Sequence, residues 1–266
     1  MKTLDHRNAV VVGAGAGGGI AAKELSEAGL SVVLFERGKW ETFIDHDHDE
    51  LISQRTFVLE NAFGPDNERY RRVLVHSDGR EEIVLPNTWA YQNNAACVGG
   101  GTLSYGAMAW RFMEQDFRLV SKYGTVEGSS LVDWPISYQD LEPYYEKAEW
   151  EIGVAGDDSQ NPFAPPRNKP HPMPAFEYNT EATIIKPAAE NLGLHPFPIP
   201  MLRNSVPYDG RPGCIRCRYC VGFACEVDAK CGTQNTSIPQ AINTGNCEIR
   251  TEAIVSEIDV DEQGHA

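Results

Sequence analysis

The sequence predicts an α/β fold that opens with a strand, a glycine-rich turn, a helix and a second strand. The apolar run Ala9–Val12 ends at a glycine cluster, as a buried parallel strand does. From Gly19 to Ala28 apolar residues lie on one side of a predicted helix, and Gly29 marks its end. Leu30–Phe35 is rich in β-formers. This order is typical of the start of a doubly wound sheet, so we predict a Rossmann-like core over about residues 7–38.

The turn of this core has the composition of a dinucleotide site. Gly13 permits a tight turn, Gly15 has no side chain to block a pyrophosphate, and Gly18 allows close packing of the helix. Glu36 ends the second strand, where its carboxylate can accept hydrogen bonds from ribose hydroxyls and repel a 2′-phosphate. We also assign the adjacent Arg37 to this site. These residues predict a bound dinucleotide but do not distinguish FAD from NAD.

A second glycine-rich segment carries a family resemblance. Val98 is followed by Gly99, Gly100, Gly101 and Thr102. Three adjacent glycines allow backbone to approach a flat or charged group closely. The segment resembles the second FAD-contacting loop of the glucose–methanol–choline (GMC) oxidoreductases.

Two later segments extend the resemblance. They are Trp134–Tyr138 and Asp140–Tyr145. They look most like the branch of gluconate, sorbitol, fructose and glucose dehydrogenase large subunits. Matches continue from Cys220 to Arg250, so the resemblance covers essentially the whole chain.

The resemblance implies an FAD-dependent dehydrogenase. The whole chain, 1–266, would be the FAD-binding N-terminal part, with a flavin loop over about residues 95–112 and Val255 touching the adenine through its backbone. A hydride would pass from a CH–OH group of a sugar, sugar acid or polyol to the flavin, and electrons would leave to a quinone or cytochrome acceptor. A small subunit and a cytochrome c subunit are the implied partners. Two alternatives stay open: a long-chain alcohol oxidase of the same family, and a non-catalytic FAD-binding fragment.

The resemblance assigns no catalytic residue to this chain. The family's active-site base is a histidine in the C-terminal half, and none of the seven histidines here lies in a matching context. The chain also stops just after a predicted turn at Asp261–Gly264, with no partner strand. We therefore expect a C-terminally truncated chain that lacks the substrate domain.

Seven cysteines are present, and five lie between Cys214 and Cys231. Cys214, Cys217, Cys220 and Cys225 have the spacing C-x2-C-x2-C-x4-C within the cysteine-rich segment 213–232. Three interpretations are left open. Some members of the resembling branch bind an iron–sulfur cluster in this region, four thiolates also suit structural zinc, and the thiols could instead hold no metal. Cys97 is expected to be a buried small residue.

The middle of the chain predicts inserted helices and loops. Asp140 is the expected N-cap of a helix ending before Gly153, which would put Pro143 in the first turn. Residues 181–192 and 237–243 are further expected helices, and the proline-rich stretch 161–174 is an irregular connector. We expect Arg111 to form a structural ion pair rather than to face the flavin, and Trp110 to be a core aromatic rather than to line a substrate site.

Composition limits the partners. The formal net charge of −15 disfavours nucleic acid, because a polyanion would be repelled. No apolar stretch is long enough to span a membrane, and no targeting segment is evident. The location is left open between the cytoplasm and a periplasm reached by co-export with a signal-bearing partner.

Overall fold

The computed structural model describes residues 5–46, 48, 71–85 and 95–263. The chain forms two compact units. The first, which we call the nucleotide unit, joins residues 1–106 to residues 216–266, and the second, the inserted unit, is residues 107–215. The nucleotide unit is thus discontinuous in sequence, because residues 216–266 from the far end of the chain complete it.

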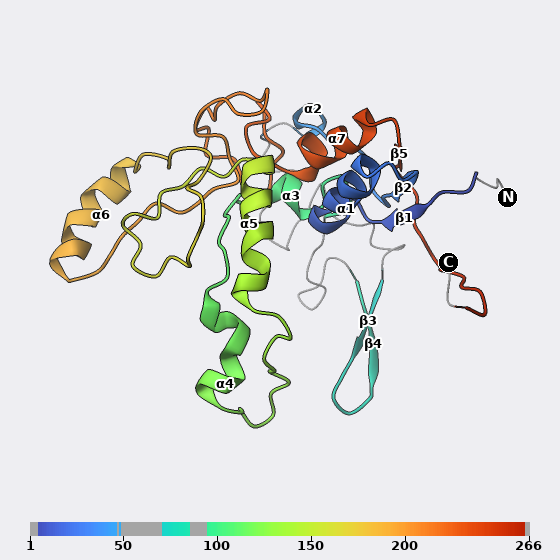
Figure 1. Ribbon diagram of the computed structural model, residues 1–266, viewed down its shortest axis with the longest axis horizontal. Coiled ribbons are helices and arrows are strands. Elements are labelled where there is room, and N and C mark those ends of the chain that lie inside the picture. Colours follow the sequence, from blue (N-terminus) through green and yellow to red (C-terminus); the bar gives the residue numbers. More distant parts are fainter. Residues whose placement is uncertain (1–4, 47, 49–70, 86–94, 264–266) are drawn as a thin grey trace. The chain divides into compact units, whose positions relative to one another are not determined.

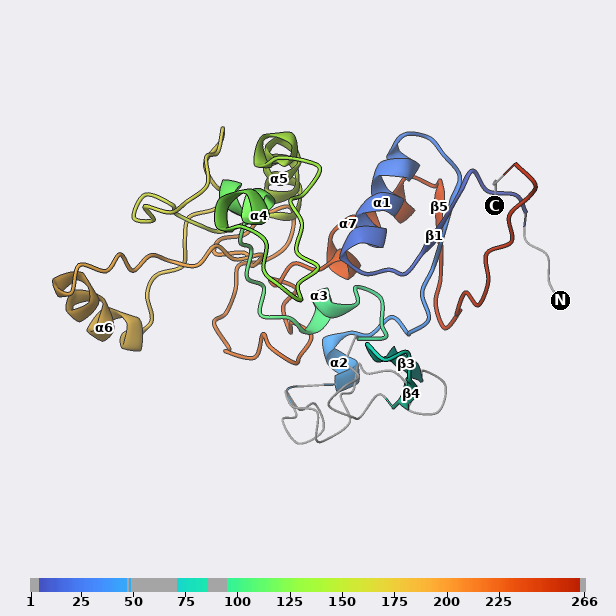
Figure 2. The same ribbon diagram turned by 90° about the horizontal axis from the view of Figure 1, so that it is seen from below.

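The nucleotide unit contains a parallel three-stranded sheet of order β1-β2-β5. Its strands are β1 (Ala9–Val12), β2 (Val32–Phe35) and β5 (Cys247–Arg250). Helices α1 (Ala16–Glu27) and α7 (Ser237–Asn243) lie side by side against one face of this sheet (Figures 1 and 2). The α/β class and the strand–turn–helix–strand opening are therefore confirmed, and the expected helix at 237–243 is present.

The core of this unit lies between the sheet and the two helices. Val32 and Leu34 of β2 are fully buried and pack in one cluster with Ala22 of α1 and with Ile238 and Ala241 of α7. On the opposite face Val10 and Val12 are 59% and 53% exposed. The expectation that β1 is buried is thus wrong on one face, since in the described part of the chain the packed helices cover only the other.

Helix α1 begins earlier than its apolar pattern predicts. Its first residue is Ala16, inside the glycine motif, and Gly15 is the extended N-cap residue. The first helical hydrogen bond runs from the Gly19 N–H to the Gly15 carbonyl, at 2.9 Å. Glycines lack side chains and so leave no periodic signal, which is why the pattern missed this first turn.

The remaining elements of the nucleotide unit are short. A hairpin forms from β3 (Arg72–Val75) and β4 (Glu81–Val84), an antiparallel pair closed by a turn in which Gly79 has φ +83°. The others are α2 (Phe43–His46), α3 (Gly101–Ser104) and the 3₁₀ turn η2 (Thr233–Asn235).

The inserted unit is helical and loop-rich. Its elements are η1 (Glu114–Arg118), α4 (Leu119–Tyr123), α5 (Tyr138–Ile152) and α6 (Thr180–Asn191). The connector 161–174 forms no helix or strand, only an isolated bridge at Met173, as expected.

The N-cap of α5 is Ser137, not Asp140. The Ser137 hydroxyl accepts the Asp140 N–H at 3.3 Å, and the Asp140 carboxylate accepts the Ser137 N–H at 2.8 Å. This reciprocal capping box places Asp140 at the third helical position and Pro143 in the second turn. The Ser137 N–H and the Ser137 hydroxyl both donate to the exposed Asp140 carboxylate, and these hydrogen bonds hold its pKa below the ordinary value.

Replacing the cap should weaken this helix measurably. We expect Ser137→Ala to lower the free energy of unfolding by about 1 kcal/mol, because the Asp140 N–H loses its partner. Chemical denaturation followed by circular dichroism measures the effect. The exposed Ser256→Ala serves as the control, and equal effects of the two changes would contradict the capping role.

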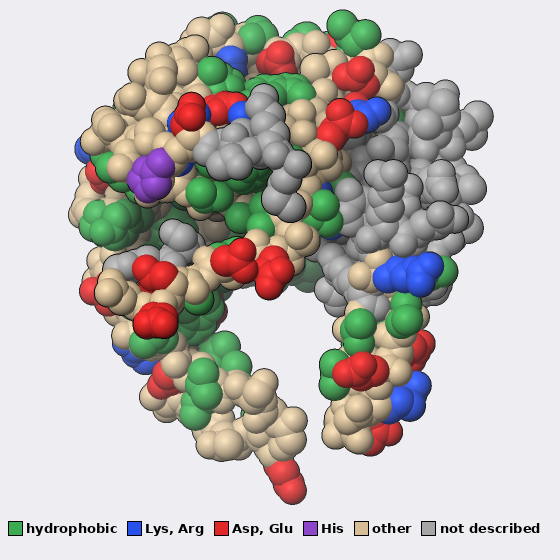
Figure 3. Space-filling view, turned by 90° about the vertical axis from the view of Figure 1, so that its right-hand side faces the viewer, with side chains coloured by type: hydrophobic (Ala, Val, Ile, Leu, Met, Phe, Trp, Pro, Cys, Tyr) green, Lys and Arg blue, Asp and Glu red, His purple; other side chains and the backbone are tan. Residues whose placement is uncertain are grey.

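Both acidic and basic side chains are exposed in the described part of the chain. On the face drawn in Figure 3, Asp and Glu side chains are scattered between Lys and Arg side chains. Within the described ranges, no helix has the length and apolar character needed to cross a bilayer.

Candidate nucleotide-binding site

The first glycine turn has the geometry that its sequence predicts. Gly13 has φ +93°, a conformation that residues with a Cβ rarely adopt. A Cβ on Gly18 would lie 1.9 Å from the Gly13 carbonyl oxygen, so this position requires glycine. A Cβ on Gly15 would meet nothing within 4 Å. Gly13 and Gly18 thus shape the turn, whereas Gly15 keeps a space open beside it.

The N-terminus of α1 faces this turn with its amide groups uncapped. No side chain caps Gly15, and no acidic residue lies in the first turn. Free N–H groups and the positive end of the helix dipole attract an anion such as a pyrophosphate. With Gly15 open beside them, these amides fit a diphosphate.

The second glycine loop packs directly on the first. The Gly99 N–H donates to the Ala14 carbonyl at 2.9 Å. A Cβ on Gly100 would lie 3.2 Å from the Gly15 Cα, and both Gly99 and Gly100 have positive φ. The structure therefore brings Gly99, Gly100 and Gly15 together, although they lie far apart in the sequence.

Two residues that the sequence analysis missed join these loops. The Thr233 hydroxyl donates to the Ala14 carbonyl at 3.0 Å, and the Thr233 N–H donates to the Thr102 hydroxyl at 3.2 Å. Gln234 is buried, and its Oε1 would lie 2.4 Å from a Cβ on Gly99. These two residues lie in a 3₁₀ turn that is too short to show a periodic sequence pattern. Only its position just before the apolar pattern of α7 could have indicated it.

Glu36 is buried at the end of β2. One carboxylate oxygen accepts the Ala14 N–H at 2.9 Å, and the other accepts the Gly38 N–H at 2.8 Å. Each oxygen has a second lone pair, so the carboxylate can still accept a hydroxyl. Glu36 thus also fixes the turn, a role that its spacing alone did not reveal.

The other two predicted nucleotide contacts lie near Glu36. Arg37 follows it directly and is half-buried. The Ala253 N–H donates to the Glu36 carbonyl at 2.9 Å, and the half-buried Val255 follows two residues further along the chain.

The four predicted metal ligands are not gathered into a ligand set. In the described residues no three His, Cys, Asp or Glu side chains lie close enough together to hold a metal ion. No disulfide links any of the seven cysteines. Cys214 belongs to the inserted unit, whereas Cys217, Cys220 and Cys225 belong to the nucleotide unit. Cys97 is fully buried, as expected, and this burial raises its pKa to about 12.

The cysteine-rich segment also contains a buried lysine. Lys230 is 1% exposed, and its ammonium donates to backbone carbonyls of Cys220, Phe223 and Tyr105. Burial lowers its pKa to about 8, and the thiols of Cys220, Cys225 and Cys217 oppose that shift.

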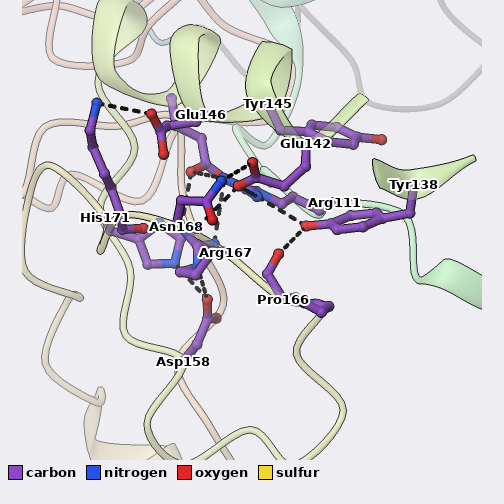
Figure 4. A network of polar contacts seen from close by, with 12 residues as sticks. Arg111, Tyr138, Glu142, Tyr145, Glu146, Asp158, Pro166, Arg167, Asn168 and His171 are labelled. Atoms are coloured by element: carbon purple, nitrogen blue, oxygen red, sulfur yellow. Dashed lines mark hydrogen bonds and ion pairs between the residues drawn. The ribbon is translucent and has the colours of Figure 1, made fainter. Parts of the chain in front are cut away.

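Arg111 belongs to a buried polar network of the inserted unit (Figure 4). Its guanidinium binds both carboxylate oxygens of Glu149, each at 2.7 Å, and donates to the Tyr138 hydroxyl at 3.0 Å. Burial opposes the charge, but the Glu149 hydrogen bonds raise the pKa of Arg111. Arg167 joins Glu149 to Asp158, which also contacts His171. The expected structural ion pair is confirmed.

Trp110, by contrast, is not a core aromatic. It is 51% exposed and makes an edge-to-face contact with Phe197, with ring centroids 5.7 Å apart. Its ring lines a cavity of about 290 Å³ within the inserted unit, together with Phe163, Arg167 and Phe197.

Several known proteins are similar in sequence to this chain over most of its length. The gluconate 2-dehydrogenase flavoprotein of Pantoea cypripedii is 28% identical over 98% of this chain and 46% of its own. The fructose dehydrogenase large subunit of Gluconobacter japonicus is 34% identical over 83% of this chain and 40% of its own. An uncharacterized GMC-type oxidoreductase of Mycobacterium tuberculosis is 26% identical over 91% of this chain. No protein-family model matches the chain.

The chain is a relative of the GMC oxidoreductases. These similarities confirm the resemblance that the two glycine loops indicated. They also confirm the likeness to the branch of gluconate and fructose dehydrogenases. The chain spans less than half of the length of these relatives, 46% and 40% respectively.

Proposed function

We propose that this chain is the FAD-binding part of a dehydrogenase that oxidises CH–OH groups of sugars, sugar acids or polyols. The observation that carries the proposal is the contact between the two glycine loops, made by the Gly99 N–H and the Ala14 carbonyl. A nucleotide cradle alone suits many cofactors, whereas this second loop is the feature that resembles the GMC enzymes. The names of the relatives, a flavoprotein and sugar or sugar-acid dehydrogenases, support the same proposal.

The residues of the chain would bind and orient the cofactor. The α1 N-terminus and the space at Gly15 would take the pyrophosphate, and the Glu36 carboxylate would take the ribose hydroxyls. Arg37 and the Val255 backbone would lie on the adenine side. Gly99–Thr102 would lie by the flavin, which when bound supplies the acceptor for the hydride of the alcohol carbon.

Electron transfer to a quinone or cytochrome, through a small subunit and a cytochrome c subunit, belongs to the proposal as well. One relative is named as a large subunit, which supports a multi-subunit assembly. The long-chain alcohol oxidase is the competing function. Comparing rates with oxygen and with a quinone analogue separates them, since the dehydrogenase should prefer the quinone.

The iron–sulfur cluster expected from the cysteine spacing is not part of this proposal. The described residues offer no converging set of three ligands, so the side chains as arranged do not fit a cluster or a zinc ion.

Substitution at Gly15 tests the proposed cofactor site without disturbing the turn. We expect Gly15→Ala in the full-length gene product to keep its thermal stability but lose most bound FAD, because the added methyl enters the space left for the pyrophosphate. Flavin absorbance of the purified protein measures the loss. Gly17→Ala is the matched control, since its Cβ also meets nothing within 4 Å. Full FAD content in Gly15→Ala would place the pyrophosphate elsewhere.

A further inference from the structure

We propose that the Lys230 ammonium is the organising centre of the cysteine loop, residues 217–231, and takes there the structural place of a metal ion. It would hold this loop against the second glycine loop.

The ammonium has a complete set of acceptors. Its three N–H bonds match three backbone carbonyls, at 2.5 Å for Cys220, 2.7 Å for Phe223 and 3.2 Å for Tyr105. A buried charge is tolerated only where such partners replace water. Lys230 is 1% exposed, so these carbonyls are what keep its charge in the interior.

The acceptors come from two separate segments. Cys220 and Phe223 lie in the cysteine loop, whereas Tyr105 directly follows α3 and the glycines before it. Two further hydrogen bonds join the same segments, from the Gly222 N–H to the Ser104 carbonyl at 2.7 Å and from the Tyr105 hydroxyl to the Cys231 carbonyl at 2.6 Å. Lys230 thus lies at a junction between the cysteine loop and the loop of Gly99–Thr102.

The loop needs such an anchor because its own backbone is irregular. Arg218 and Asp228 have φ of +72° and +54°, which is costly for residues other than glycine. No helix or strand forms between Cys217 and Cys231. The contacts around Lys230 therefore supply the order that regular hydrogen bonding would supply elsewhere.

The cysteines of this loop do not converge on a common point. The Cys225 sulfur accepts the Lys230 backbone N–H at 3.4 Å. Among the described residues no three such ligands form a metal site. The sequence spacing that resembles a cluster motif would then reflect a loop built around an internal cation.

Metal analysis and thiol labelling test this proposal in the full-length gene product purified without oxygen. We expect substoichiometric iron and zinc in the wild type. In Lys230→Met we expect the labelling rates of Cys217, Cys220 and Cys225 with a thiol reagent to rise about tenfold or more, because the loop opens more often. Lys186→Met, on an exposed pair with Glu190, should leave these rates unchanged.

Two results would overturn the proposal. One is stoichiometric iron or zinc that is lost in Cys220→Ser, and the other is unchanged labelling in Lys230→Met. If Lys230→Met does not fold, the metal content of the wild type and of Cys220→Ser still tests the proposal. FAD content of the wild type tests the proposed function separately, so the two failures are distinguishable.

Discussion

Gly18→Ala should abolish FAD binding and lower the stability of the nucleotide unit. The new Cβ would lie 1.9 Å from the Gly13 carbonyl oxygen, 3.1 Å from its carbonyl carbon and 3.3 Å from a Val11 methyl. Backbone cannot move aside as a flexible side chain can, so we expect a cost at or above about 3 kcal/mol, the upper end for overpacking. Thermal unfolding and flavin absorbance of the full-length gene product measure both effects.

The contrast with the neighbouring glycines makes this result specific. Gly17→Ala should retain both stability and FAD, and Gly15→Ala should retain stability alone. A Gly18→Ala protein that binds FAD normally would show that the turn tolerates a Cβ there, and would contradict the packing of α1 on β1.

Arg111→Met should destabilise the inserted unit by about 3–5 kcal/mol. The side chains of Arg111 and Glu149 are only 2% and 7% exposed, so removing the guanidinium leaves a buried carboxylate poorly compensated. Denaturant unfolding measures the change. Lys147→Met on α5, the helix that carries Glu149, breaks an exposed pair with Glu151 and should cost less than about 1 kcal/mol.

A double variant and the pH dependence of stability test whether the buried ion pair causes this loss. Arg111→Met with Glu149→Leu should cost less than the sum of the single changes, since both charges then leave the interior. Burial raises the pKa of Glu149, but Arg111 and Arg167 overcome this and hold its pKa below 4.5, the ordinary value for a glutamate. Its stabilising contribution is thus present above that pH and lost as the pH falls. An additive double variant with an unchanged pH profile would contradict the coupling.

The nucleotide turn could be predicted because each of its signals is local. The spacing of Gly13, Gly15 and Gly18 after an apolar strand fixes the turn, and Glu36 follows at the end of the next strand. The joining residues Thr233 and Gln234 could not be predicted. They meet Ala14 and Gly99 only through the tertiary fold, across more than a hundred residues of chain.

Two errors in the inserted unit have a common cause. Proline avoidance argued for Asp140 as N-cap, but the capping box with Ser137 outweighs one proline in the second turn. Likewise the core is the default place for an aromatic residue such as Trp110, yet its neighbours leave it 51% exposed beside a cavity. In both cases a general preference of the residue type was outweighed by specific contacts in the fold.

The cysteines show how a spacing can suggest more than a structure supports. The interval C-x2-C-x2-C-x4-C would let four thiolates converge, but convergence depends on backbone path, which spacing does not specify. In the described structure that path places the backbone carbonyls of Cys220 and Phe223 at the Lys230 ammonium, and Tyr105 from another segment supplies the third carbonyl. The sequence shows a lysine among the cysteines. It does not show that this lysine is buried or which carbonyls it contacts.

The most direct test of this account is the cofactor content of the full-length gene product. Released cofactor, separated by chromatography and identified by mass, should be FAD at about one per chain, the stoichiometry of a single nucleotide-binding site. A folded protein that is colourless, or that releases a nicotinamide dinucleotide instead, would contradict the assignment of the two glycine loops to FAD.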